Sequence, residues 1–171
     1  GFDYETWVID WNEYRDLLKA YIAQDVIDLE MLYDNAAFAV NYYFAQKYNV
    51  KTILSGDNYA TEGIPMPIEW SWQKYDATNI LSIAKSANIK LKTFPYIRFR
   101  RVFIAKLMGF NRIPFLNYIN YDRRIALEKL IHIGYESYPY KHYESVFTRF
   151  YQGEILPVKF SVDKRLIHLS S

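Results

Sequence analysis

The sequence contains no cysteine and only three histidines, His132, His142 and His168. The absence of cysteine excludes disulfides and thiolate-bound metals. The scattered histidines do not form the spacing of a zinc site. Apolar runs are short and interrupted by charge, so neither a membrane-spanning helix nor a signal peptide is predicted. The six glycines are isolated from one another, so the 171 residues contain no glycine-rich phosphate-binding run.

Acidic residues are missing from the whole stretch between Asp76 and Asp122. Residues 1–84 contain five Lys/Arg and thirteen Asp/Glu, a net charge of −8, whereas residues 85–171 contain sixteen and six, a net charge of +10. A basic half of this kind suits an anionic partner such as phosphate, a sugar nucleotide or nucleic acid. Neutralisation of the acidic half within one fold or a dimer explains the same asymmetry.

Aromatic side chains are abundant, with 17 Tyr, 11 Phe and 4 Trp. Tyrosine joins an apolar ring to a hydroxyl, which suits ligand and subunit surfaces, and a tyrosine-rich core accounts for the composition equally well. A hydrophobic fraction of 51% excludes a disordered chain. The length fits one globular domain, with room for a helical appendage.

The first half of the chain has the pattern of an α/β unit with a parallel sheet. β-forming residues predict strands over 4–10 and 51–55. Apolar residues at helical spacing predict helices over 13–23, capped by Asn12, and over 28–48. A polar loop punctuated by Gly and Pro follows the second strand as far as residue 75.

The second half is predicted to be mostly helical and basic. Helices are expected over 76–87, 97–108 and 122–133, the last two ending at Gly109 and Gly134, and a briefly extended segment over 89–94. Two more helices, 143–151 and 163–171, are expected on either side of a loop at 153–157. We therefore expect two regions, 1–75 and 76–171.

The loop after the second predicted strand, Ser55–Gly63, has the clearest chemical pattern. It follows the carboxyl end of a strand, where open α/β sheets bind ligands. Gly56 would let the backbone turn and approach a ligand, while Asp57 and Glu62 supply the carboxylate oxygens that Mg²⁺ prefers. Shaping of the turn by Asp57 and Asn58 explains the same residues without a ligand.

Three further segments combine charge with aromatic or acid–base groups. Residues 141–149 carry Lys141, His142, Glu144 and Arg149, although a solvated amphipathic helix has the same appearance. Residues 156–171 place Lys159, Lys164 and Arg165 where they could clamp phosphate, or simply lie on the surface. Residues 94–101 interleave basic and aromatic side chains as RNA-binding surfaces do, but the pattern favours a basic amphipathic helix facing an acidic partner.

Three motifs in this order, SGDNYATEGIP (55–65), KHYESVFTRFYQG (141–153) and LPVKFSVDKRLIHLSS (156–171), resemble the N-acetyl sugar amidotransferases. These are PP-loop ATP pyrophosphatases of bacterial surface-polysaccharide biosynthesis, related to asparagine synthase. The resemblance implies a partial, Rossmann-like PP-loop domain of the adenine nucleotide alpha hydrolase type over 1–75. A helical substrate or partner region over 76–171 would follow it.

The resemblance also implies the reaction and its partners. ATP would adenylate the oxygen of a sugar N-acetyl group, and ammonia would displace AMP to leave an acetamidino group, with ATP and Mg²⁺ as cofactors. The expected substrate is a nucleotide-linked acetamido sugar, and the expected ammonia source is a glutaminase/cyclase-type subunit. A cytoplasmic location and a possible homodimer are expected, but neither a membrane nor a nucleic acid partner.

The resemblance assigns roles residue by residue. Glu62 and Asp57 would bind Mg²⁺; Gly56, Asp57 and Asn58 would contact the nucleotide; and Lys159, Lys164 and Arg165 would contact its phosphates. The sugar would lie against Lys141, His142, Glu144 and Arg149, with His142 or Glu144 acting as the acid–base group on ammonia.

One departure from the family pattern is the missing SGGxDS loop that cradles phosphate. We therefore expect this chain to be part of a longer enzyme and to be inactive by itself. Two alternatives are another PP-loop enzyme, tRNA-modifying or NAD-synthase-like, and a non-catalytic module that docks a partner.

Overall fold

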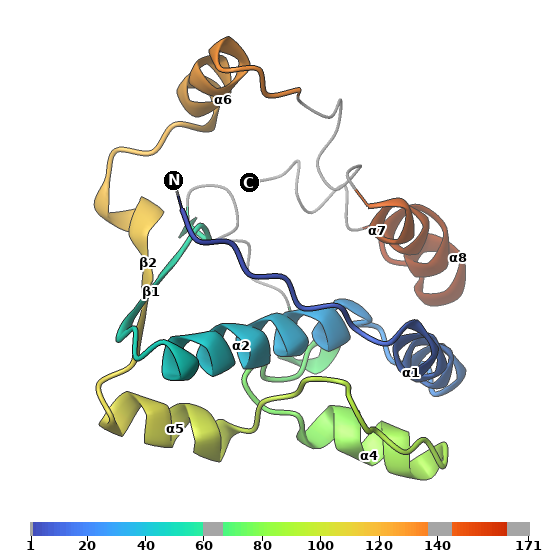
Figure 1. The fold of residues 1–171 in the computed structure, drawn as a ribbon. Helices are drawn as coiled ribbons and strands as arrows, with labels where there is room; N and C mark the ends of the chain where they lie inside the picture. Colours follow the sequence, from blue (N-terminus) through green and yellow to red (C-terminus); the bar gives the residue numbers. More distant parts are fainter. Residues whose placement is uncertain (1, 60–66, 137–144, 164–171) are drawn as a thin grey trace. The chain divides into compact units, whose positions relative to one another are not determined.

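The computed structural model describes residues 2–59, 67–136 and 145–163 (Figure 1). They belong to two compact units, each described separately below. Unit 1 comprises residues 1–53 and 66–112, and unit 2 comprises residues 54–65 and 113–171. The boundary expected at residue 75 follows from the change of pattern along the sequence, from an α/β unit to a mostly helical, basic region, and stays a prediction.

Unit 1 begins with two helices that the sequence predicted, α1 (Trp11–Ala23) and α2 (Glu30–Lys47). The N-cap of α1 is Asp10 and not the predicted Asn12, because the Asp10 carboxylate accepts a hydrogen bond of 3.0 Å from the backbone N–H of Glu13. The strand predicted over 4–10 is wrong: residues 2–10 form an almost wholly exposed coil. β-forming residues make a strand only when a second strand supplies the hydrogen-bonding partners.

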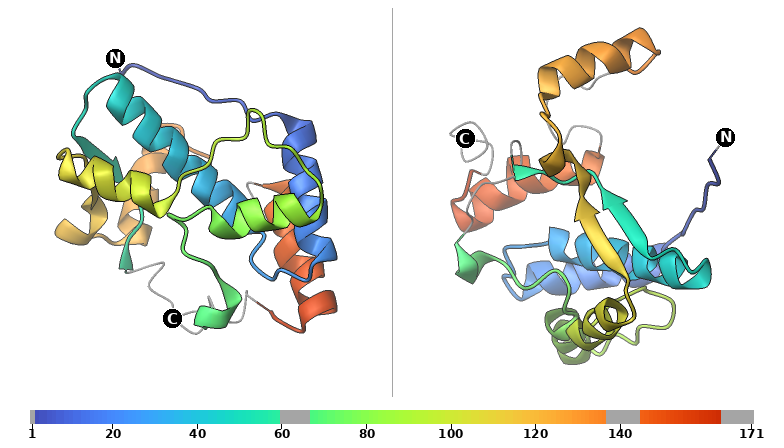
Figure 2. Two further views of the ribbon diagram at one scale, coloured as in Figure 1. Left: turned by 90° about the horizontal axis from the view of Figure 1, so that it is seen from below. Right: turned by 90° about the vertical axis from the view of Figure 1, so that its left-hand side faces the viewer.

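The strands β1 (Thr52–Ser55) and β2 (Asn111–Pro114) form a parallel pair, seen side by side in Figure 2. The structure confirms the first and adds the second, which the sequence did not predict. Parallel strands need a long crossover, and here it contains η1 (Ile68–Trp70), α4 (Thr78–Ser86) and α5 (Phe99–Leu107). Gly109, with φ +83°, ends α5 in the predicted left-handed conformation.

A buried asparagine joins α2 to two loops of unit 1. The Asn35 side chain is fully buried; its Nδ2 donates to the carbonyl oxygens of Lys74 (2.9 Å) and Ile97 (3.0 Å), and its Oδ1 accepts from the N–H of Ile97 (3.0 Å). Fully buried apolar side chains complete the core, among them Leu17, Tyr21, Leu29, Leu32 and Ile80. The chain before α4 and the chain before α5 are therefore fixed to the N-terminal third of α2.

Unit 2 begins with the end of β1 and, after β2, continues with η2 (Phe115–Tyr118) and α6 (Arg123–His132). The Asp122 side chain caps α6 by accepting from the N–H groups of Arg124 and Ile125, and Gly134 follows with φ +90°. The sequence predicted a helix over 122–133 that ends at Gly134, and the structure adds the capping role of the Asp122 side chain.

The last part of unit 2 corrects the sequence prediction. Its helices are α7 (Val146–Phe150), a π-helical turn η3 (Tyr151–Ile155) and α8 (Leu156–Phe160), which follow one another without a break. The loop predicted at 153–157 is wrong because Pro157 lies at the N-terminal end of α8, where a helix tolerates proline. The helix predicted over 163–171 lies, except for Asp163, outside the described residues.

The described residues thus form a mixed α/β structure with one parallel strand pair and a larger helical part. Among these residues, no helix combines the length and the apolar character needed to cross a membrane.

Candidate functional site at the carboxyl end of β1

The loop that leaves β1 holds a carboxylate beside the end of the strand. The hydroxyl of Ser55 donates a hydrogen bond to Oδ1 of Asp57. Nδ2 of the buried Asn58 donates to the carbonyl oxygen of Gly56, at 3.4 Å. Because ligands of open α/β sheets bind at the carboxyl ends of the strands, the Asp57 carboxylate occupies a position suited to a ligand contact.

A second segment meets this loop. The backbone N–H of Tyr59 donates to Oδ1 of Asn117, at 2.9 Å. Asn117 lies in η2, directly after β2. The segments that follow the two strands are therefore tied together at one edge of the pair, as expected of parallel strands. Sequence reasoning missed Asn117 because it did not find β2; a polar residue soon after a strand would have been the signal.

Gly56 has an open environment. A Cβ added at this position would meet no atom within 4 Å, and its φ lies outside the left-handed region. The structure therefore corrects the expectation that the turn itself needs glycine here. Space for the close approach of a ligand remains as a reason for this residue.

One half of the predicted metal pair is described. Asp57 follows β1, whereas Glu62 lies outside the described residues. Within 2–59, 67–136 and 145–163 no three His, Asp or Glu residues gather in a group that could hold a metal. Proteins often bind Mg²⁺ through only one or two carboxylates, the remaining oxygens coming from phosphates and water. The donors at Asp57 and Ser55 fit that minimal arrangement.

The other predicted site residues are only partly described. Arg149 is exposed on α7 and Lys159 is exposed on α8, and both belong to unit 2, as do Gly56, Asp57 and Asn58. The Lys159 ammonium lies 5.8 Å from the ring centroid of Phe160. The remaining predicted residues lie outside the described part of the chain: Lys141, His142, Glu144, Lys164 and Arg165.

The π-helical turn contributes a polar side chain that the sequence prediction missed. Gln152 is buried, next to the buried Tyr151, in the stretch predicted to end a helix. Single π-turns inside α-helices are frequent at functional sites. The signal available in the sequence was a glutamine between apolar residues of a helical pattern, which also fits an exposed position.

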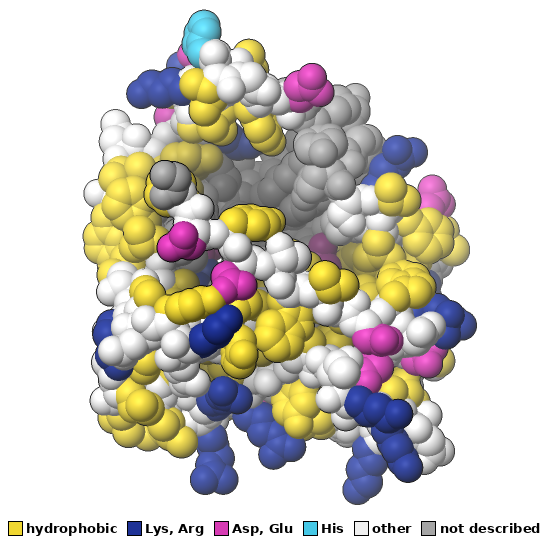
Figure 3. Space-filling view, in the orientation of Figure 1, with side chains coloured by type: hydrophobic (Ala, Val, Ile, Leu, Met, Phe, Trp, Pro, Cys, Tyr) yellow, Lys and Arg dark blue, Asp and Glu magenta, His cyan; other side chains and the backbone are white. Residues whose placement is uncertain are grey.

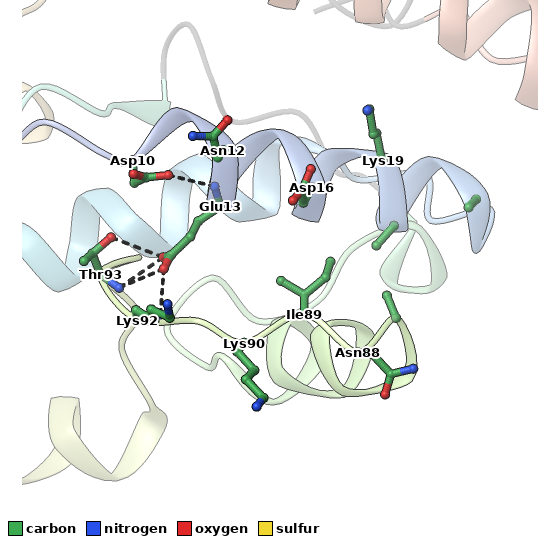
Figure 4. Close-up of a pocket in the computed structure, with 13 residues that line it drawn as sticks. Asp10, Asn12, Glu13, Asp16, Lys19, Asn88, Ile89, Lys90, Lys92 and Thr93 are labelled. Carbon is green, nitrogen blue, oxygen red and sulfur yellow. Dashed lines mark hydrogen bonds between the residues drawn. The ribbon is translucent and has the colours of Figure 1, made fainter.

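A groove of about 800 Å³ lies in unit 1, between α1 and the chain that follows α4 (Figure 4). The Glu13 carboxylate reaches across it and accepts hydrogen bonds from the N–H groups of Lys92 (2.8 Å), Thr93 (3.1 Å) and Phe94 (2.7 Å). Burial alone would raise the pKa of Glu13, but these donors outweigh it and lower the pKa below its usual value. The groove's central carboxylate therefore anchors the loop.

A smaller hollow in unit 1, of about 210 Å³, is lined by Trp70 and Trp72 together with acidic residues. Its Asp28 accepts from the Lys74 ammonium at 2.6 Å, and Asp34 lies 3.0 Å from the same ammonium. Burial would lower the pKa of Lys74, but the two carboxylates raise it above its usual value. Burial raises the pKa of Asp34 despite the neighbouring ammonium.

Comparisons with known proteins assign the chain to no family. No protein-family model matches the chain, and searches of the curated proteins and of the solved structures found no match.

Proposed function

We propose that this chain is part of an ATP-dependent amidotransferase that converts the acetamido group of a nucleotide-linked sugar into an acetamidino group. The observation that supports this proposal most directly is the geometry of the loop at the end of β1. It holds Asp57 beside the strand through Ser55 and is tied to the segment after β2 through Asn117. The motif at 55–65, which resembles that of the sugar amidotransferases, falls on this loop.

The chemistry requires that the amide oxygen become a good leaving group. The acetamido oxygen attacks the α-phosphorus of ATP, the bond to the β-phosphate oxygen breaks, and pyrophosphate leaves. Ammonia then attacks the imidate carbon and gives up one proton to a base, and AMP departs with the oxygen, which leaves the acetamidino group as its amidinium cation. Both steps require cations close to the phosphates, and the second step also requires a group that accepts a proton from the attacking ammonia.

The residues of unit 2 would share these tasks. Asp57, with Glu62, would hold Mg²⁺, which offsets the charge that develops on the departing pyrophosphate. Lys159, Lys164 and Arg165 would contact phosphate oxygens. Lys141 and Arg149 would orient the sugar, while His142 or Glu144 accepts the proton. Because the 171 residues contain no glycine-rich run, a segment outside them would hold the β- and γ-phosphates.

The test is AMP formation from ATP, ammonium and UDP-linked acetamido sugars by the natural gene product that contains this chain. We expect Asp57→Asn to lower the rate roughly 100-fold, the size of effect seen when one electrostatic contact to a transition state is removed. Gly56→Ala tests ligand space at the same loop and should lower the rate without altering the fold, because nothing packs against this glycine.

Asp3→Asn is the matched control, since Asp3 lies in the exposed coil of residues 2–10. It should leave AMP formation unchanged. AMP formation that needs no acetamido sugar, or an Asp57→Asn variant within twofold of the parent, would contradict the proposal. Transfer of AMP to tRNA instead would favour the tRNA-modifying alternative.

A further inference from the structure

Helix α5 exposes an apolar surface that no described part of unit 1 covers. Its buried side is small: Ala105 is fully buried, and Val102 packs against the cluster of Tyr42, Ile97 and Phe110. Five large apolar side chains on the other side are between 50% and 73% exposed: Phe99, Phe103, Ile104, Leu107 and Met108. They lie in a nine-residue helix and the residue that follows it.

The spacing of these residues makes a continuous face. Phe99, Phe103 and Leu107 follow one another at intervals of four and form one ridge, and Ile104 and Met108 form the neighbouring ridge. Viewed along the helix, both ridges point away from Val102 and Ala105. We call this surface of five side chains the α5 face.

Basic residues lie both beside and within the α5 face: Arg101 and Lys106 lie at its two sides, and Arg100 lies between the two ridges, four residues before Ile104. Arg98, Arg100, Arg101 and Lys106 are all exposed, and residues 77–121 contain eight Lys/Arg and no Asp/Glu. In the described part of the chain, none of the four forms an ion pair, and the guanidinium of Arg101 donates to the side-chain oxygen of Gln46, at 3.3 Å. Hydrophobic and basic side chains lie together over α5 in Figure 3.

The occupant of this surface must offer an apolar region to the two ridges and anionic groups to the basic side chains beside and between them. A second copy packed through its own α5 face would bring like charges together, which is unfavourable. An anionic membrane surface has the required layering, because lipid phosphates lie just outside the acyl chains. Lys and Arg stems can follow the apolar surface while their charged ends stay at the level of the headgroups.

We propose that α5 is a membrane-surface helix that places Phe103 and Leu107 among the acyl chains of anionic phospholipids. Arg100, Arg101 and Lys106 contact the phosphates. The proposal is independent of the amidotransferase function, and it replaces the sequence-based expectation that no membrane is a partner. The contact is shallow, because a helix of this length is about 13 Å long and cannot span a bilayer of roughly 30 Å.

Sedimentation of the 171-residue chain with vesicles tests this. We expect binding to vesicles of phosphatidylcholine with 30 mol% phosphatidylglycerol, weak or no binding to phosphatidylcholine alone, and a loss of binding as salt increases. Replacing Arg100 and Arg101 by Gln should weaken binding roughly 25-fold, about fivefold for each cation. Phe103→Ser with Leu107→Ser should weaken it at least about tenfold.

Matched controls distinguish vesicle binding through the α5 face from nonspecific binding through other exposed apolar side chains. Tyr33→Ser with Val50→Ser removes two exposed apolar side chains elsewhere in unit 1 and should not change binding. In a parallel pair of variants, Phe103→Trp adds one tryptophan to the four native ones, and its emission, taken as the difference from the parent protein, should shift to shorter wavelength on anionic vesicles. The tryptophan of Tyr33→Trp should not. Circular dichroism confirms that each variant keeps its helices.

Three results would overturn the proposal. The first is the absence of binding to anionic vesicles at low salt. The second is binding that Phe103→Ser with Leu107→Ser leaves intact, which would indicate attraction by charge alone, as for RNA or any polyanion. The third is a concentration-dependent dimer, seen by light scattering, that the same two substitutions abolish; this would assign the α5 face to a second copy of the chain.

Discussion

Unit 1 and unit 2 differ in the side-chain interactions that stabilise them. In unit 1, side chains connect positions far apart in the sequence: Asn35 binds Ile97, Glu13 binds Phe94, and the hydroxyl of Tyr21 donates to Asn79 at 2.8 Å. In the described part of unit 2, the buried side chains are concentrated in residues 151–162, and α6 has none.

This difference separates scaffold from candidate site. The residues assigned to nucleotide, metal and sugar all belong to unit 2, while the most extensive burial lies in unit 1. Segments that bind ligands are often drawn from the less stable part of a protein. We therefore expect substitutions in unit 1 to change mainly the free energy of unfolding, and substitutions at the end of β1 to change mainly activity.

The largest effect is expected at Asn35. Replacing it by Ala removes the side-chain partner of the buried N–H of Ile97 and of the carbonyl oxygen of Lys74, at a cost of about 3 kcal/mol, while the carbonyl oxygen of Ile97 keeps its hydrogen bond from the N–H of Ala77. Urea unfolding followed by circular dichroism measures the loss. Asn12→Ala, at an exposed position of α1, should change stability by less than about 0.5 kcal/mol. If Asn12→Ala and Asn35→Ala lowered the free energy of unfolding equally, the buried hydrogen bonds of Asn35 would not make the contribution expected here.

The next largest effect on stability is expected at Leu156, and its substitution tests whether the two units unfold separately. Leu156 is buried in α8, so Leu156→Ala should cost about 2.5 kcal/mol, whereas Val158→Ala, on an exposed side chain of the same helix, should cost little. Hydrogen exchange read by mass spectrometry should show lost protection within unit 2 and unchanged protection in α1 and α2. Equal loss in both units would mean that they unfold as one.

Glu13 gives a pH-dependent effect. Its pKa is lowered in the folded protein from a usual value near 4.5, so its stabilisation is fully present above that pH. The stabilisation is lost as the pH falls through the lower, folded-state pKa. Glu13→Gln should cost about 1 kcal/mol at pH 7, a value reduced for partial exposure to solvent. The difference from the parent should shrink in acid.

Thermal unfolding between pH 3 and pH 7 measures the Glu13 effect. Glu69→Gln replaces an exposed glutamate of the same unit and should follow the parent at every pH. A Glu13→Gln penalty that grows as the pH falls would contradict a lowered pKa of Glu13 in the folded protein.

The smallest effect on stability is expected at Gly56. Gly56→Ala meets no neighbouring atom and needs no left-handed backbone, so stability should change by less than about 0.5 kcal/mol. A loss above about 2 kcal/mol would show that Gly56 serves the fold, and the comparison between scaffold and site would then fail at this residue.

Local signals in the sequence predicted most of the helices. Apolar spacing marked α1 and α2, Asp122 marked the start of α6, and Gly109 and Gly134 marked helix ends. These features depend on residues within one or two helical turns of each other. They can therefore be predicted from the sequence without knowledge of the fold.

Features that depend on residues far apart in the sequence could not be predicted from the sequence. Residues 4–10 have the composition of a strand but form coil in the structure, whereas the short β2 exists because it pairs with β1. The importance of Asn35 arises from backbone groups 39 and 62 residues away. At the site, the position of Asp57 after a strand was predictable, but its connection to Asn117 through Tyr59 was not.

The π-helical turn at Tyr151–Ile155 has a consequence for comparing sequences. Such a turn accommodates one residue more than an α-helical turn, and each residue of an α-helix advances by about 100° around the axis. Every side chain after Ile155, Lys159 included, therefore faces a direction that a regular helix would give to a different residue number. Aligning this stretch with a regular helix requires a one-residue gap, and without it Lys159 would be equated with the wrong position.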